Sequence, residues 1–152
     1  MVIYLHNHKV NSQQFSILLA DDDIDDCKFF QNAVDELQLA TRLNIVHNGE
    51  ELMKHLNDNV DQLPDVLFLD LSMPRKTGFE CLSEIKEDEF LKGLPVIVFT
   101  TSFTSGIDFE ADLARILTKI GTEEYIRKPG NFEMLKQIIS NVIVKIQNRI
   151  QT

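Results

Sequence analysis

The sequence VLFLDLSMP, from Val66 to Pro74, places an aspartate at the end of an apolar run. The run Val66–Leu69 is short and almost wholly apolar, which is typical of a strand buried on both faces of a parallel sheet. Asp70 follows this run directly, and the chain then turns at Pro74. Because a buried carboxylate costs free energy unless it is paired or used, Asp70 is a candidate functional residue.

Four more runs of this kind occur along the chain, and amphipathic segments with helical spacing separate them. The runs are Ile17–Ala20, Leu43–His47, Val96–Phe99 and a weaker one at Glu124–Arg127. One of the predicted helices, at about Glu50–Leu56, is short. Strands that alternate with helices imply right-handed crossovers, so the sequence predicts an α/β fold with a doubly wound, five-stranded parallel sheet and helices on both faces.

Length and charge limit the classes of function. The 152 residues suggest one domain with a sizeable core. The net charge of −9 argues against nucleic acid or an anionic membrane as a direct partner. No apolar run approaches the roughly 20 residues of a membrane span, and the amino terminus is a poor signal peptide, so we expect a cytoplasmic protein. Cys27 and Cys81 form no CxxC pair and are expected to be buried structural thiols.

Polar residues follow four of the predicted strands. Asp21, Asp22 and Asp23 end the first run, Asp70 ends the third, Thr100 and Thr101 end the fourth, and Lys128 ends the fifth. Ligands of open α/β sheets bind beyond the carboxyl ends of the strands. We therefore expect these side chains to converge on one edge of the sheet.

The acidic residues of this edge predict a metal site. Two carboxylates about 4 Å apart repel by about 4 kcal/mol at an effective dielectric constant of about 20. A divalent cation would offset that repulsion between Asp21, Asp22 and Asp70, and oxygen ligands favour Mg²⁺, with Mn²⁺ as the alternative. A carboxylate nucleophile, a hydroxyl and a lysine beside such an ion suit phosphoryl transfer, with Asp70 as the group that becomes an acyl phosphate.

Four motifs resemble the receiver domain of two-component response regulators. They are ILLADDD at 17–23, LFLDLSMPRKTGFE at 67–80, PVIVFTTS at 95–102 and YIRKP at 125–129. The resemblance covers roughly Phe15 to Asn148 and implies a flavodoxin-like strand order 2-1-3-4-5. The stretches DDDIDD and HNGEELMKHL resemble the single-domain subgroup that pairs with phytochrome-type and other hybrid sensor kinases.

The resemblance also implies a role for each matching residue of the acidic edge. Asp70 is the phospho-acceptor. Asp22 binds Mg²⁺ directly, Asp21 binds it directly or through water, and the backbone carbonyl of Ser72 supplies another ligand. The metal set is therefore Asp21, Asp22, Asp70 and Ser72.

Four further positions take roles from the same resemblance. Thr100 and Lys128 hold phosphoryl oxygens. Thr100 and Tyr125 form the switch, in which the aromatic ring turns inward when Thr100 moves towards the phosphate. The bond between Lys128 and Pro129 is expected to be cis.

From these expectations we predict a phosphoryl-accepting signalling switch rather than a turnover enzyme. Residues 1–14 are an amino-terminal extension, 15–148 the receiver domain and 149–152 a tail. The phosphoryl donor is a sensor histidine kinase or a histidine phosphotransfer protein. Because no DNA-binding output segment is recognisable, we expect the output to be contact with a downstream protein or a further phosphotransfer. The wide apolar face of the last helix has two interpretations. It is either buried within the domain, or it forms a homodimer or partner surface together with the helix before it.

Two other functions stay open at this point. The first is a Mg²⁺-dependent phosphatase with an aspartyl nucleophile, although such enzymes usually carry a second Asp where this chain has Ser72. The second is a module of the same fold that binds its partner without phosphorylation. Each site residue also has a simpler interpretation by itself: Asp23 can cap a helix, and Lys128 can be a solvated surface charge.

Overall fold

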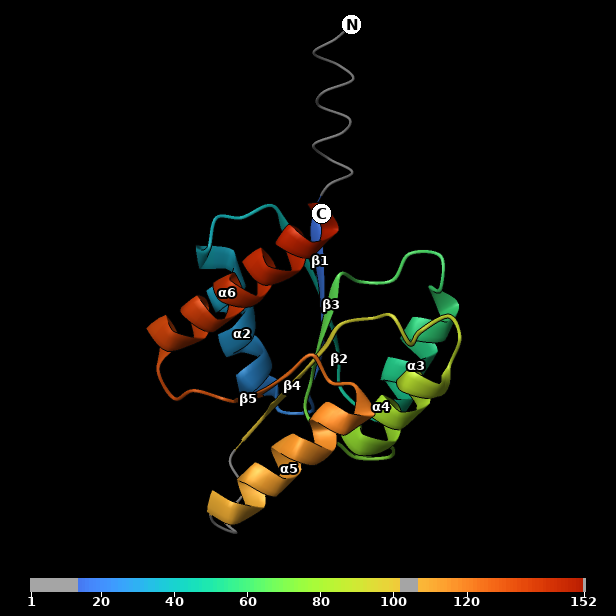
Figure 1. Cartoon of the computed structure of the whole chain (residues 1–152). Helices are drawn as coiled ribbons and strands as arrows, with labels where there is room; N and C mark the ends of the chain where they lie inside the picture. The colour runs from blue at the N-terminus through green and yellow to red at the C-terminus, as the bar shows by residue number, and fades with distance from the viewer. Residues whose placement is uncertain (1–13, 102–106, 152) are drawn as a thin grey trace, which may run out of the picture.

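The computed structural model of the chain describes residues 14–101 and 107–151, in which five strands alternate with five helices (Figure 1). The strands are β1 (Phe15–Ala20), β2 (Thr41–Val46), β3 (Val66–Leu69), β4 (Val96–Thr100) and β5 (Glu124–Arg127). The helices are α2 (Ile24–Glu36), α3 (Gly49–Asp58), α4 (Gly78–Glu87), α5 (Ile107–Ile120) and α6 (Phe132–Gln151). The amino-terminal extension predicted at 1–14 lies almost wholly outside the described residues, and α6 continues into the predicted tail.

All four strand pairings are parallel, and the sheet has the order β2-β1-β3-β4-β5. The predicted topology is thereby confirmed. Every residue of β1, β3 and β4 is buried, whereas the edge strands β2 and β5 have exposed positions. The runs at Ile17–Ala20, Val66–Leu69 and Val96–Phe99 are therefore covered on both faces, whereas the run at Leu43–His47, predicted to be of the same kind, lies on an edge strand.

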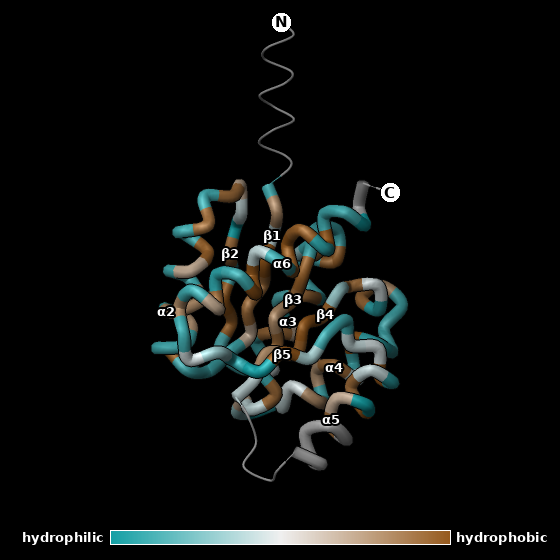
Figure 2. The backbone as a smooth tube through the Cα atoms, turned by 60° about the vertical axis from the view of Figure 1, so that its left-hand side comes forward, coloured by the Kyte–Doolittle hydropathy of each residue, from teal (hydrophilic) through white to brown (hydrophobic). Residues whose placement is uncertain are grey.

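Helices cover both faces of this sheet. Figure 1 shows α2 and α6 on one side and α3, α4 and α5 on the other, and Figure 2 shows that hydrophobic residues concentrate on the strands between them. Ile17 and Leu19 face the α2–α6 side, whereas Leu18 and Ala20 face the other side. This alternation divides the core into two layers, as the pleat of a strand requires.

Four helices begin just beyond the carboxyl edge of the sheet with a side-chain cap. Asp23, Asn48, Thr77 and Asn131 accept hydrogen bonds from the backbone N–H groups three residues further on, at the starts of α2, α3, α4 and α6. The expected capping role of Asp23 is confirmed. Each cap satisfies a backbone donor that the helix leaves without a partner, so the loops that carry the polar residues are anchored at their far ends.

Cys27 and Cys81 are buried free thiols, as predicted. Burial raises the pKa of each thiol to about 11, so both stay protonated at neutral pH. In the described part of the chain, no helix has the length and apolarity that crossing a membrane requires.

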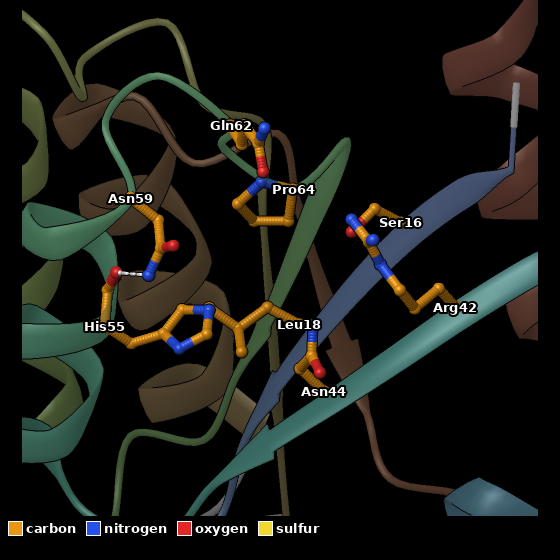
Figure 3. Close-up of a pocket in the computed structure, with 8 residues that line it drawn as sticks. All are labelled: Ser16, Leu18, Arg42, Asn44, His55, Asn59, Gln62 and Pro64. Atoms are coloured by element: carbon orange, nitrogen blue, oxygen red, sulfur yellow. Dashed lines mark hydrogen bonds between the residues drawn. The ribbon is translucent and has the colours of Figure 1, made fainter. Parts of the chain in front are cut away.

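A polar hollow of about 200 Å³ lies between β1, β2, α3 and the loop that follows α3 (Figure 3). Arg42 and Asn44 of β2 border it, opposite Ser16 and Leu18 of β1 in the sheet register. His55 of α3 also borders it. None of the residues predicted for the acidic edge lines this hollow.

Candidate functional site

The carboxyl edge of the sheet brings the predicted acidic, hydroxyl and lysine side chains together. Sheet hydrogen bonds continue one residue past three strands: Asp21 N–H donates to Val46, Asp70 N–H to Ala20, and Lys128 N–H to Thr100, over 2.8–3.0 Å. The backbone of each site residue is therefore fixed by its neighbouring strand.

Three carboxylates gather at this edge. One oxygen each from Asp21, Asp22 and Asp70 lies within 4.8 Å of the other two. Asp21 and Asp70 are 1% and 5% exposed, whereas Asp22 is exposed to solvent. A set of oxygen donors that is open on one side suits a hard divalent cation that retains several water ligands. The residues predicted as side-chain metal ligands therefore fit Mg²⁺ or Mn²⁺.

Lys128 is the counter-charge of this cluster. Its Nζ lies 2.7 Å from Asp21 Oδ2, 2.9 Å from Asp26 Oδ2 and 3.4 Å from Asp70 Oδ2. The lysine side chain is 10% exposed, so little water screens these contacts. Lys128 is thus a partly buried residue of the site rather than a solvated surface charge.

Two donors fix the Asp70 carboxylate. The hydroxyl of Thr100 donates to Asp70 Oδ1 over 2.8 Å, and the backbone N–H of Ser72 donates to the same oxygen over 3.1 Å. Thr100 is 1% exposed. With Oδ1 held in this way, the other oxygen, Oδ2, points to Lys128.

Burial and charge shift two pKa values at the site. Burial raises the pKa of Asp21 to about 6, although the hydrogen bond from Lys128 opposes the shift. Burial by itself would lower the pKa of Lys128, but its hydrogen bonds to Asp21 and Asp26 outweigh that effect and raise it. The pKa shifts therefore keep Lys128 charged at neutral pH and favour protonation of Asp21 in mild acid.

A close backbone contact holds the loop that follows Asp70. Gly78, at the start of α4, donates its N–H to the carbonyl of Leu71 over 3.1 Å. A Cβ atom at position 78 would lie 2.4 Å from the carbonyl oxygen of Asp70. This position therefore has no room for a side chain, and the loop is held directly against the helix that follows it.

Two residues of the site were not predicted. Asp26, in the first turn of α2, reaches Lys128. The ring Nδ1 of His47 lies 3.1 Å from the backbone carbonyl oxygen of Asp21. His47 ends the second apolar run, so the reasoning that selected Asp70 and Lys128 could have included it. Asp26 could be recognised only from the structure, because the orientation of α2 about its own axis decides whether Asp25 or Asp26 faces Lys128.

Two other predicted roles concern residues beside the cluster. Tyr125 is half-buried on β5 and packs against the core layer of α3, α4 and α5. In the sheet register it lies opposite Val98, two positions before the pair formed by Thr100 and Arg127. The switch role of Tyr125 and the metal role of the Ser72 carbonyl stay predictions.

The expected cis bond before Pro129 is wrong, because no peptide bond among the described residues is cis. The trans form is favoured by about 0.5–1 kcal/mol even before proline. With this trans bond, Lys128 still pairs with Thr100 and reaches the carboxylates.

Comparison with known proteins agrees with this geometry. Residues 17–140 match the family model of the response regulator receiver domain. The chain is 30% identical over 131 residues to the probable methanogenesis regulatory protein FilR2 of Methanothrix harundinacea. The aligned region covers 84% of this chain and 81% of FilR2. It spans less than two thirds of the length of several other curated relatives.

Two solved structures are also similar. One is the phosphorylated cyanobacterial phytochrome response regulator RcpA, with a TM-score of 0.72, 31% identity, and coverage of 85% of this chain and 91% of RcpA. The other is the Mn²⁺-bound form of response regulator Rcp1, known from Synechocystis, with a TM-score of 0.70 and 29% identity over 82% of this chain and 91% of that one.

Proposed function

The chain belongs to the response regulator receiver family of two-component signalling, and from this premise we propose that Asp70 accepts the phosphoryl group. The observation that carries the proposal is the convergence of Asp70, Thr100 and Lys128 at the carboxyl edge of the sheet. We take residues 15–148 as the receiver domain.

Each residue of this arrangement has a task in the transfer. An oxygen of the Asp70 carboxylate attacks the phosphorus of a phosphohistidine, the P–N bond breaks, and the imidazole leaves with the electron pair and takes up a proton. Asp70 Oδ2 is the better placed oxygen, since Oδ1 accepts hydrogen bonds from both Thr100 and Ser72. Lys128 lies 3.4 Å from Oδ2, where its charge offsets the negative charge of the arriving phosphoryl oxygens.

Asp21, Asp22 and Asp70, with the backbone carbonyl of Ser72, would hold Mg²⁺ or Mn²⁺. The spacing of the three carboxylates supports this assignment, and Rcp1 has been crystallised with Mn²⁺. When bound, the cation neutralises the carboxylates and a phosphoryl oxygen. Asp21 must be deprotonated to take part, which its pKa of about 6 permits at neutral pH.

Phosphorylation would be read out through Thr100 and Tyr125. Once Asp70 carries a phosphoryl group, the Thr100 hydroxyl exchanges its bond to the carboxylate for one to a phosphoryl oxygen. Thr100 is the last residue of β4, and β4 is paired with β5, the strand that carries Tyr125. A displacement of Thr100 can therefore be transmitted to β5 at the edge of the sheet. The surface that switches would then bind a downstream protein or, through the last two helices, a second copy of the chain.

The donor would be a sensor histidine kinase or a histidine phosphotransfer protein. The likeness to the phytochrome response regulator RcpA supports a phytochrome-type kinase. Slow loss of the phosphate through hydrolysis at the same site would return the switch to its resting state.

The function is tested by incubation with acetyl phosphate or phosphoramidate and Mg²⁺, followed by intact mass measurement. The wild type should gain the mass of one phosphoryl group, and Asp70→Asn should gain none. Asp61→Asn, which removes an exposed carboxylate away from the site, should behave as the wild type. Equal labelling of wild type and Asp70→Asn would overturn the proposal.

A further inference from the structure

Asp26 contacts the ammonium group of Lys128 from the first turn of α2. The distance from Lys128 Nζ is 2.9 Å to Asp26 Oδ2, shorter than the 3.4 Å to Asp70 Oδ2. Within the described residues, the carboxylates whose oxygens gather within 4.8 Å are those of Asp21, Asp22 and Asp70. Asp26 therefore has the geometry of a partner for the lysine rather than of a metal ligand.

Lys128 and Asp26 border a small, mostly apolar cavity. Its volume is about 20 Å³, and Phe29, Phe30, Phe99 and Leu135 also line it. These apolar side chains offer no hydrogen-bond partner to the ammonium group. The position of Nζ is therefore decided by the carboxylates that surround it.

The contact between Asp21 and Lys128 should weaken when the Asp21 carboxylate binds a divalent cation. Its Oδ2 accepts from Lys128 over 2.7 Å, and its Oδ1 accepts from the backbone N–H of Asp23 over 3.0 Å. A cation held by the Asp21 carboxylate would repel the ammonium group and draw charge away from that contact. Asp26 lies outside the cation cluster, so its contact with Lys128 can persist.

We propose that Asp26 is a positioning residue, which keeps the Lys128 ammonium group within reach of Asp70 when Asp21 is engaged by the cation. The inference rests on the proposed function, because the lysine needs this position to meet a phosphoryl oxygen on Asp70. An acidic residue in the first turn of a helix also stabilises the helix through its interaction with the helix dipole. Asp25 lies in the same turn and has the same effect, so it provides a matched control.

The first experiment compares the wild type with Asp26→Asn, Asp26→Glu and Asp25→Asn. The rate of phosphorylation by phosphoramidate is measured at saturating Mg²⁺ from intact mass. Asp26→Asn should be slower by about threefold to tenfold, as suits one partly exposed charge-assisted contact. Asp26→Glu should recover most of the rate, and Asp25→Asn should match the wild type. If Asp25→Asn and Asp26→Asn lowered the phosphorylation rate equally, the effect would be one of net charge alone, and the proposal would be overturned.

The second experiment does not depend on phosphorylation. The side-chain ammonium signal of Lys128 is followed by ¹⁵N NMR while Mg²⁺ is added. The signal should stay sharp and shifted in wild type and Asp25→Asn, and it should broaden or move to the position of a free lysine in Asp26→Asn. A Lys128 signal that is the same in Asp26→Asn and wild type would overturn the role of Asp26, even if the wild type accepts a phosphoryl group. A wild type that accepts none would overturn the proposed function instead.

Discussion

Replacing Lys128 with methionine should destabilise the folded protein at neutral pH when Mg²⁺ is absent. The side chains of Lys128 and Asp21 are 10% and 2% exposed, and they lie 2.7 Å apart. Breaking a buried ion pair by removing one partner costs about 3–5 kcal/mol. Because the side chain of Asp26 is 40% exposed and one edge of the cluster faces water, we expect a smaller loss, of about 2–3 kcal/mol.

The loss should also depend on pH. The pKa of Asp21 is about 6 in the folded protein, because burial outweighs the effect of Lys128, and without the lysine it should be higher still. An aspartate whose folded pKa lies above its unfolded value of about 3.9 is destabilising above the folded pKa. That penalty shrinks as the pH falls towards the unfolded value, since the folded state then binds a proton. Lys128→Met should therefore lose much less stability at about pH 5 than at about pH 7.5.

The assay is urea unfolding followed by far-ultraviolet circular dichroism. Lys136→Met is the control, since Lys136 pairs with the exposed side chains of Glu36 and Glu133 and its removal should cost less than about 1 kcal/mol. Saturating Mg²⁺ should restore part of the stability of Lys128→Met. A Lys128→Met protein as stable as wild type at neutral pH, or one with the same loss at both pH values, would refute this account of the site's electrostatics.

Three other outcomes follow from the geometry. The Mg²⁺ affinity measured by calorimetry should fall as the pH drops below about 6, where Asp21 is protonated; equal affinities at about pH 7.5 and pH 5 would contradict this. Gly78→Ala should lower the free energy of unfolding by about 1–3 kcal/mol, since its Cβ would meet the backbone of Asp70, whereas Gly93→Ala has nothing within 4 Å and should change little. Thr100→Val should slow phosphorylation by about tenfold or more because it removes the hydroxyl bonded to Asp70, and Thr100→Ser should retain most of the rate; equal rates for the two variants would argue against the hydroxyl.

The central part of the fold could be predicted from local pattern. The strand at Val66–Leu69 has the predicted bounds because its apolar run is continuous and stops at a charged residue. The start of β1 was missed at Phe15 and Ser16, where a serine interrupts the run and its backbone N–H is bound by the carboxylate of Asp65. The start of β2 was missed for a related reason, since Thr41 and Arg42 lie on an edge strand that tolerates polar side chains.

The residues of the candidate site could be predicted from the sequence where they directly follow a predicted strand. Asp21, Asp70, Thr100 and Lys128 each stand at or just beyond a strand end, so the parallel topology by itself brings them together. Asp26 could not be found in this way, because it lies one turn into a helix and its direction depends on how α2 packs. Sequence also could not show that Asp70 directs one oxygen to Thr100 and the other to Lys128, since that depends on side-chain rotation.

The site of covalent phosphate is the most direct test of the whole account. After incubation with phosphoramidate and Mg²⁺, reduction with borohydride converts an aspartyl phosphate to homoserine, and peptide mass mapping locates the converted residue. We expect homoserine at position 70 and unmodified aspartate at positions 21 and 22. Homoserine at position 21 or 22, or at no position in a protein that has gained the phosphoryl mass, would contradict it.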